Sequence, residues 1–286
     1  MAGRAAMNIA WQRGWPAPAK LNLMLHVVGR RADGYHLLQT VFRLIDLADT
    51  LSFAPRADGA IRLAAPLAGV PEVDDLTVRA ARLLQAETGC GAGAMISVEK
   101  RIPLGGGLGG GSSDAATTLI ALNELWGTGL ARPDLERIGL RLGADVPFFL
   151  LGRNAFGEGI GEVLTPVDLP PAWYVVITPQ VAVSTREMFA APELTRNTKP
   201  LKITVFFAGL GRNDLEPVVR ARFPEVARAL EWLAGHGAAR MSGSGASVFA
   251  AFEREDEARA VAAKVPGEWR AWAVRGLDRH PLRPER

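Results

Sequence analysis

Residues 103–116 of the chain read PLGGGLGGGSSDAA. Six of the seven residues from Gly105 to Gly111 are glycine, and two serines and an aspartate follow them. Glycine loses more backbone entropy on folding than any other residue, so such a run weakens a protein unless its backbone has a task. The neighbouring sequence indicates what that task is.

The glycine run lies between a predicted strand and a predicted helix. Residues 94–99, AMISVE, have the composition of a short strand. After the run, Ala115 and Leu119 begin a helical spacing of apolar residues, and Ser112 or Ser113 is placed to cap that helix. A flexible linker does not connect a strand to a capped, amphipathic helix, so the run is interpreted as a binding loop.

Three known kinds of glycine loop can be compared with this one. The spacing of Gly105, Gly107 and Gly110 matches a dinucleotide fingerprint, but no strand ending in an acidic residue follows; the nearest candidate, Asp134, begins another helix. No lysine follows Gly111, as a Walker A loop requires. A protein-kinase loop lies within a β-hairpin rather than before a helix. What remains is their shared physics: backbone N–H groups and a helix N-terminus that favour a polyphosphate.

The rest of the chain predicts mixed helices and strands. The predicted elements are a strand at 20–28, a turn at 31–34, a helix at 74–89, a helix from Pro133, a buried strand at 146–151, a strand at 173–179, a helix at 216–234, a glycine turn and strand over 240–252, a helix at 256–265 and a strand at 269–274. Strands and helices do not alternate regularly, which favours the α+β class. The segment 165–171, TPVDLPP, is the predicted domain junction.

Composition narrows the class of protein. The 286 residues are 48% hydrophobic and 22% charged, with a net charge of +3 and one cysteine. These values predict a cytoplasmic protein without disulfides that binds an anionic small molecule, with no nucleic acid or membrane partner. The N-terminal segment lacks a continuous apolar core and a cleavage site, so no signal peptide is expected.

Two charged residues lie in unusual surroundings. Lys20, with Asn22, is on the polar face of the first strand, and Asp145 stands alone among apolar neighbours just before 146–151. A buried carboxylate is costly unless it is paired. Spacing alone favours ordinary roles, in which the lysine snorkels at a strand edge and the aspartate caps a turn.

Three ordered motifs resemble those of the GHMP kinase superfamily: PAPAKLNLMLHV at 16–27, the glycine run at 103–116, and MSGSGASVF at 241–249. GRRADGYHLLQTVF at 29–42, LGADVPFF at 142–149 and GEGIGEVLTP at 157–166 extend the resemblance to one branch of the family. The resemblance implies a two-domain α+β GHMP kinase fold. Residues 1–165 would form an N-terminal ATP-binding domain similar to ribosomal protein S5 domain 2, and residues 166–286 a ferredoxin-like C-terminal domain, with the active site between them.

The resemblance also implies a reaction. The chain would use ATP and Mg²⁺ to phosphorylate the 2-hydroxyl of a small molecule, methylerythritol linked to cytidine diphosphate, in non-mevalonate isoprenoid biosynthesis. A monomer or weak homodimer is expected. Rival hypotheses are a related kinase acting on homoserine, mevalonate or a sugar, a nicotinamide-dependent reductase, and a noncatalytic phosphate- or RNA-binding protein.

The resemblance assigns roles to individual residues. Lys20 and Asp145 are the implied catalytic pair: the aspartate accepts or orients the proton of the attacking hydroxyl, and the lysine keeps it ionised and stabilises the transferring group. The implied ATP-binding residues are Lys100, Pro103, Leu104, Gly105, Gly106, Gly107, Leu108, Gly109, Gly110, Gly111, Ser112 and Ser113. The implied substrate-binding residues are Asn22, Tyr35, His36, Thr185 and Phe189. The third-motif loop contains Gly243, Ser244 and Gly245, and no metal ligand is assigned.

The sequence departs from the family pattern at two positions. Asp75 and Asp114 stand where asparagine is common. The aspartate at position 75 leaves the contacts to adenine unassigned. The aspartate at position 114 suits the helix dipole but would repel a nearby triphosphate.

Overall fold

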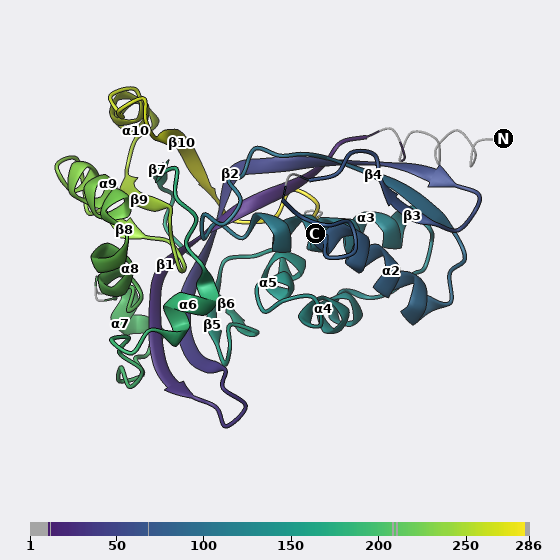
Figure 1. Cartoon of the computed structure of the whole chain (residues 1–286), viewed down its shortest axis with the longest axis horizontal. Coiled ribbons are helices and arrows are strands. Elements are labelled where there is room, and N and C mark those ends of the chain that lie inside the picture. The colour runs from purple at the N-terminus through teal and green to yellow at the C-terminus, as the bar shows by residue number, and fades with distance from the viewer. Residues whose placement is uncertain (1–10, 12, 68, 208, 210, 284–286) are drawn as a thin grey trace.

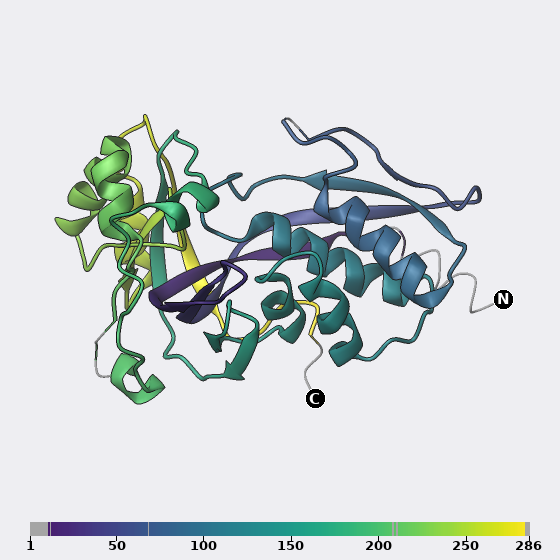
Figure 2. The ribbon, with the colours of Figure 1, turned by 60° about the horizontal axis from the view of Figure 1, so that its bottom comes forward.

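In the computed structural model, which describes residues 11, 13–67, 69–207, 209 and 211–283, the chain forms two halves joined by a pair of long strands (Figures 1 and 2). These strands are β1 (Trp15–Arg30) and β2 (His36–Arg56), which pair antiparallel through the turn predicted at 31–34. Most of the N-terminal segment considered for a signal peptide lies outside the described residues.

The N-terminal half packs helices against one face of these strands (Figure 1). Its helices are α2 (Leu76–Thr88), α3 (Gly110–Leu125), α4 (Arg132–Leu140) and α5 (Val146–Leu151), and its further strands are β3 (Ile61–Leu63), β4 (Gly93–Glu99), β5 (Ala155–Glu158) and β6 (Val163–Pro166). Apolar side chains from both layers, including Phe42, Leu119 and Phe149, form one buried core. Burial of that apolar surface is the main force that holds the helices on the sheet.

The C-terminal half has its own core and sheet. Its strands are β7 (Trp173–Thr178), β8 (Arg240–Met241), β9 (Val248–Phe252) and β10 (Arg270–Leu277), and its helices are α6 (Thr185–Ala190), α7 (Ile203–Phe207), α8 (Glu216–Arg222), α9 (Pro224–Ala234) and α10 (Glu255–Ala262). Strand β10 pairs with β2, so the sheet continues in the order β3-β4-β2-β10-β7-β9-β8. The α+β class predicted from the sequence is confirmed.

The prediction of a strand over 146–151 is wrong, because these residues form α5. A short apolar run is compatible with a buried strand or a buried helix. Pro147 in the first turn has no N–H to donate to a sheet, and Gly152 ends the helix at a φ of 66°. Asp145 therefore precedes a helix rather than a strand, and its side chain makes no capping hydrogen bond.

Two further details differ from the sequence predictions. The single helix expected over 216–234 is divided into α8 and α9, because Pro224 cannot continue the first helix and instead begins the second. Neither Ser112 nor Ser113 caps α3: the helix begins one turn earlier, at Gly110, after the left-handed Gly109.

The long strands contribute to both halves. Leu25 and Val27, near the end of β1, pack into the core of the C-terminal half. The end of the chain in turn reaches the N-terminal half, where the His280 N–H donates to the Gly152 carbonyl at 3.0 Å. The domain boundary at 165/166 stays a prediction.

Candidate active site

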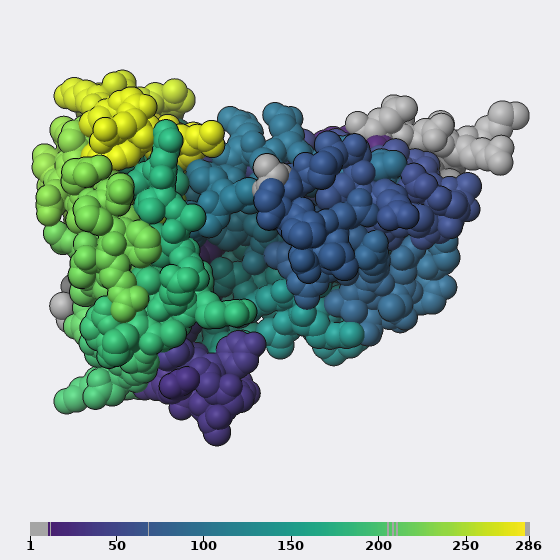
Figure 3. Space-filling view, in the orientation of Figure 1, coloured from purple at the N-terminus to yellow at the C-terminus, as the bar shows by residue number. Residues whose placement is uncertain are grey.

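The surface is hollowed between the two halves (Figure 3), and a cavity of about 420 Å³ opens there onto the glycine run. Lys20 lies at its floor, where β1 leaves its regular pairing with β2. The Lys20 N–H donates to the Leu108 carbonyl at 2.9 Å, so the strand is bonded to the glycine loop at this point. The irregular register thus brings the first and second motifs together.

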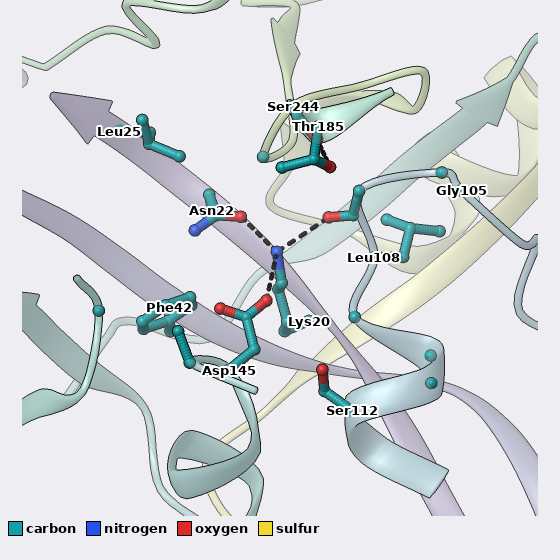
Figure 4. Close-up of a pocket in the computed structure, with 18 of the residues that line it drawn as sticks. Lys20, Asn22, Leu25, Phe42, Gly105, Leu108, Ser112, Asp145, Thr185 and Ser244 are labelled. Atoms are coloured by element: carbon teal, nitrogen blue, oxygen red, sulfur yellow. Dashed lines mark hydrogen bonds and ion pairs between the residues drawn. The ribbon is translucent and has the colours of Figure 1, made fainter. Parts of the chain in front are cut away.

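The Lys20 ammonium group faces three oxygen atoms (Figure 4). It donates to the Asn22 side-chain oxygen and to the Gly107 carbonyl at 2.9 Å, and it lies 3.5 Å from an Asp145 carboxylate oxygen. Burial lowers the pKa of Lys20 below its usual 10.5, and the Asp145 charge acts in the opposite direction. Lys20 is therefore buried and paired rather than snorkelling, which contradicts the interpretation that spacing alone favoured.

The two members of this ion pair differ in exposure. The Lys20 side chain is 4% exposed, whereas that of Asp145 is 33% exposed. The aspartate therefore presents its carboxylate to the cavity, and the buried lysine pairs with it. Its side chain makes no capping hydrogen bond, so the capping role considered from the sequence is wrong. An exposed carboxylate held by a buried cation is suited to receive a proton from a bound hydroxyl group.

Asn22 is fixed by its own set of partners. Its side-chain amide donates to the Thr40 hydroxyl at 2.8 Å, and its backbone N–H donates to the Ser242 hydroxyl at 3.2 Å. Ser242 in turn donates to the Gly107 carbonyl at 3.0 Å. Residues from the first, second and third motifs therefore converge on the Lys20 ammonium.

Eleven of the twelve predicted ATP-binding residues line the cavity: Lys100, Pro103, Leu104, Gly105, Gly106, Gly107, Leu108, Gly109, Gly110, Gly111 and Ser112. The exception is Ser113, whose fully buried hydroxyl donates to the Pro18 carbonyl at 2.7 Å. Ser113 joins α3 to β1 and does not face the cavity. The glycine run leads directly into α3, whose first residues are Gly110 and Gly111, and the N-terminus of this helix favours an anion at this end of the cavity.

Close approach to the third motif requires glycine at position 107. A methyl group at Gly107 would lie 2.3 Å from the Ser242 carbonyl oxygen and 2.9 Å from the Gly245 carbonyl oxygen, and the backbone φ is +72°. We expect Gly107→Ala to lower the free energy of unfolding by about 2–5 kcal/mol, from backbone strain and overpacking together. Urea-induced unfolding followed by circular dichroism measures the change.

Gly105→Ala is the matched control for that experiment. Gly105 has a similar φ of +67°, but a methyl group there would meet nothing within 4 Å. Its substitution should cost only the backbone term, about 1–2 kcal/mol. Equal losses in the two variants would contradict the close packing of Gly107 against the third motif.

Lys100 is held by two buried carboxylates beside the loop. Its ammonium lies 2.7 Å from Asp114 and also contacts Asp49. Burial raises the pKa of Asp114 to about 7, Lys100 opposes that shift, and Asp49 adds to it. Although burial lowers it, the charges of Asp114 and Asp49 raise the pKa of Lys100 overall. Lys100 thus compensates the charge of Asp114, which reduces the repulsion of a nearby triphosphate that the sequence predicted.

The other unusual acid, Asp75, has a structural role. Its buried side chain caps α2 by accepting hydrogen bonds from the backbone N–H groups of Thr77 and Val78. It is not among the residues that line the cavity.

The third motif closes the cavity from the C-terminal half. Gly243 and Ser244 line it, whereas Gly245 packs toward Met241 and does not. The Ser244 and Thr185 hydroxyls are hydrogen-bonded at 2.6 Å, which links the loop to the start of α6 (Figure 4). Thr185 therefore lies at the cavity.

A second cavity, of about 590 Å³, adjoins the first. It is lined by Tyr35, His36 and Phe189, three of the five residues implied to bind the substrate. His36 and Phe189 are stacked with ring centroids 5.0 Å apart, and Tyr35 is 61% exposed beside them. The two cavities share Thr185 and Phe189 among other lining residues, so an elongated molecule can extend from one to the other.

Sequence reasoning missed several residues of the site. Thr40 supports Asn22, and Ile160 and Gly161 line the first cavity from the turn before β6. The stretches 29–42 and 157–166 were recognised, but no role was assigned to these positions. Arg196, which lines the second cavity, had no sequence signal at all.

Within the described parts of the chain, no cluster of three or more histidine, cysteine or acidic side chains could hold a metal ion. No helix among the same residues is long and apolar enough to cross a bilayer.

Comparison with known proteins identifies the family. Residues 75–153 match the model of the GHMP kinases N terminal domain, and residues 199–271 match that of the GHMP kinases C terminal domain. A 4-diphosphocytidyl-2-C-methyl-D-erythritol kinase of Aromatoleum aromaticum is 62% identical over 268 residues, 94% of each chain.

Solved structures agree with these matches. A crystal structure of 4-(cytidine 5'-diphospho)-2C-methyl-D-erythritol kinase superposes with a TM-score of 0.81 at 38% identity, over 92% of this chain and 99% of the other. A homoserine kinase from Cytophaga hutchinsonii superposes with a TM-score of 0.69 at 17% identity, over 92% of this chain and 93% of the other. The latter shows a common fold only.

Proposed function

The chain belongs to the GHMP kinase family, and we propose that it transfers a phosphoryl group from ATP to the 2-hydroxyl of 4-diphosphocytidyl-2-C-methyl-D-erythritol. Relatives named 4-diphosphocytidyl-2-C-methyl-D-erythritol kinase are about 60% identical to this chain over most of its length. The product would be the 2-phosphate, formed with ADP, in the non-mevalonate route to isoprenoid precursors. Cytoplasmic location and a monomeric or weakly dimeric state stay predictions.

One observation carries the proposal: the Lys20–Asp145 pair lies between a glycine loop and an aromatic cavity. Phosphoryl transfer has a loose transition state, so positioning and charge stabilisation provide most of the catalysis. A carboxylate and an ammonium 3.5 Å apart supply both, next to a loop suited to phosphates.

The proposed chemistry begins at Asp145. Its carboxylate accepts or orients the proton of the 2-hydroxyl as the oxygen attacks phosphorus. Lys20 pairs with that carboxylate at 3.5 Å and stabilises negative charge on the transferring group. Asn22 and the Gly107 carbonyl hold the lysine in place by accepting its other hydrogen bonds.

The phosphate end of the cavity fits ATP with Mg²⁺. Backbone N–H groups of the glycine loop and the N-terminus of α3 favour the triphosphate. Mg²⁺ bound to phosphates keeps several waters and needs few protein ligands, and the cavity offers it the Ser112 hydroxyl. When bound, the ion neutralises charge on the phosphates.

The second cavity is suited to the cytosine. Tyr35 and Phe189 offer aromatic faces for stacking, and His36 offers a hydrogen bond to the edge of the base. Thr185 lines both cavities, which supports a role for its hydroxyl near the diphosphate of the substrate. The reacting hydroxyl would then lie near Asp145.

We expect Tyr35→Ala to raise the KM for the cytidyl substrate about 5- to 150-fold with little change in kcat, because loss of one base–aromatic stack costs about 1–3 kcal/mol. Steady-state kinetics, with rapid-equilibrium binding established separately, measure the effect. Tyr35→Phe keeps the ring and serves as the control. An unchanged KM in the alanine variant would remove Tyr35 from the site.

A substrate panel tests the proposed function directly. ADP release is measured in a coupled assay with 4-diphosphocytidyl-2-C-methyl-D-erythritol, homoserine and mevalonate, and calorimetry compares ATP with NADPH. We expect turnover with the cytidyl substrate and binding of ATP alone. Turnover with homoserine or mevalonate instead, or binding of NADPH without ATP, would contradict the proposal.

A further inference from the structure

Arg196, between α6 and α7, connects three parts of the second cavity. One of its terminal amino groups donates to the Phe189 and Ala191 carbonyls, at 3.0 and 2.6 Å, and the other donates to the Leu194 carbonyl at 3.1 Å. The bonds to Phe189 and Ala191 satisfy carbonyls at the C-terminal end of α6, the helix that carries Phe189. Its Nε–H is directed at His36.

The Nε–H of Arg196 donates to His36 Nε2 at 3.1 Å. A guanidinium group has only donors, so His36 Nε2 must be the acceptor and cannot carry a proton. Burial, together with the positive charges of Arg196 and Arg30, lowers the pKa of His36 and so favours the neutral ring. A neutral imidazole without a proton on Nε2 carries it on Nδ1.

This arrangement fixes what His36 can offer a bound base. With Nε2 occupied, its ring presents an N–H donor at Nδ1 and no acceptor. Such a donor matches N3 of cytosine, which is an acceptor, and opposes N3–H of uracil, which is a donor. The same contacts hold the Phe189 ring, which stacks on His36, so donor and stacking partner share one anchor.

We propose that Arg196 is a positioning residue that sets His36 as an Nδ1–H donor and thereby favours cytosine over uracil in the second cavity. The inference rests on the proposed function only in the identity of the base. The tautomer of His36 is a property of the free protein.

Nitrogen-15 NMR of histidine-labelled protein tests the tautomer without any substrate. The chain has four histidines, and the signal absent from His36→Gln identifies the one of interest. We expect His36 to be protonated at Nδ1 in the wild type and to shift toward the Nε2-protonated form in Arg196→Gln. A wild-type ring protonated at Nε2, or a tautomer unchanged in the variant, would overturn the proposal, and the wild-type result decides even if the variant does not fold.

Kinetics provide the second test. We expect Arg196→Gln to raise the KM for the cytidyl substrate about tenfold, as for loss of one well-made hydrogen bond, with kcat and the KM for ATP little changed. The preference for the cytidine over the uridine form of the substrate should fall by a similar factor. Arg196→Lys keeps the charge but lacks the Nε–H, so it should behave like the glutamine variant. Full rescue by lysine would show that charge, not the tautomer, matters.

Arg222→Gln is the matched control, because Arg222 pairs with Glu193 at the surface and lines neither cavity. It should keep wild-type kinetics and the wild-type tautomer. If the wild type turns over neither nucleotide form, the proposed function fails, while the NMR result on Arg196 and His36 still stands.

Discussion

Replacing Asp145 by asparagine is expected to lower kcat by about 10²- to 10⁴-fold, the usual contribution of a positioned acid or base. The asparagine side chain has the same shape and can still accept a hydrogen bond from Lys20 across the present 3.5 Å separation. It cannot take a proton from the attacking hydroxyl. Stopped-flow and steady-state kinetics with the cytidyl substrate measure the loss.

Binding measurements show whether that loss is chemical. Asp145 is opposite the glycine loop rather than part of it, so calorimetric affinity for ATP should stay close to that of the wild type. Asp134→Asn, an exposed acid on α4, controls for the change in net charge and should leave kcat unchanged. A near-normal kcat in Asp145→Asn would remove the aspartate from the proposed mechanism.

Lys20→Met is expected to lower kcat by about 10²- to 10³-fold, as for removal of one preorganised charge from a transition state. Methionine is of similar length and suits the buried position, and the backbone bond from residue 20 to Leu108 is retained. The Asn22 side-chain oxygen and the Gly107 carbonyl lose their donor, and Asp145 loses its partner. The free energy of unfolding, measured alongside kcat, should therefore fall by about 1–3 kcal/mol.

The double variant Lys20→Met with Asp145→Asn tests whether the two residues act as a unit. Groups that depend on one another show strongly non-additive losses. We expect the double variant to be little worse than the poorer single variant. Additive losses, or a near-normal kcat in Lys20→Met, would contradict the proposed pairing.

Much of the secondary structure could be predicted because its signals are local. The strand at 20–28, the helix that ends at Gly89 and the strand at 173–179 were confirmed, since alternation, helical spacing and glycine stops are properties of the chain itself. The prediction failed at 146–151, where six apolar residues carry no period long enough to distinguish a helix from a strand.

The site was predictable to a different degree at different residues. The glycine run indicated a phosphate site by itself, because its amides and the following helix lie next to one another in sequence. Lys20 and Asp145 lie 125 positions apart in the sequence. Spacing alone favoured ordinary roles for both, and only the resemblance to a family paired them. Thr40 and Arg196 were missed, because their roles depend on partners distant in the chain.

Local pattern and ordered motifs were enough to predict the α+β class, the family and a glycine loop suited to phosphates. The tertiary structure decided that Lys20 is buried, that Asp145 is turned toward the cavity rather than capping α5, and that Ser113 faces away from it. It also joined the two cavities and directed Arg196 at His36. Burial, hydrogen-bond direction and charge pairing depend on which segments meet in space, and that is set when the two halves pack around β1 and β2.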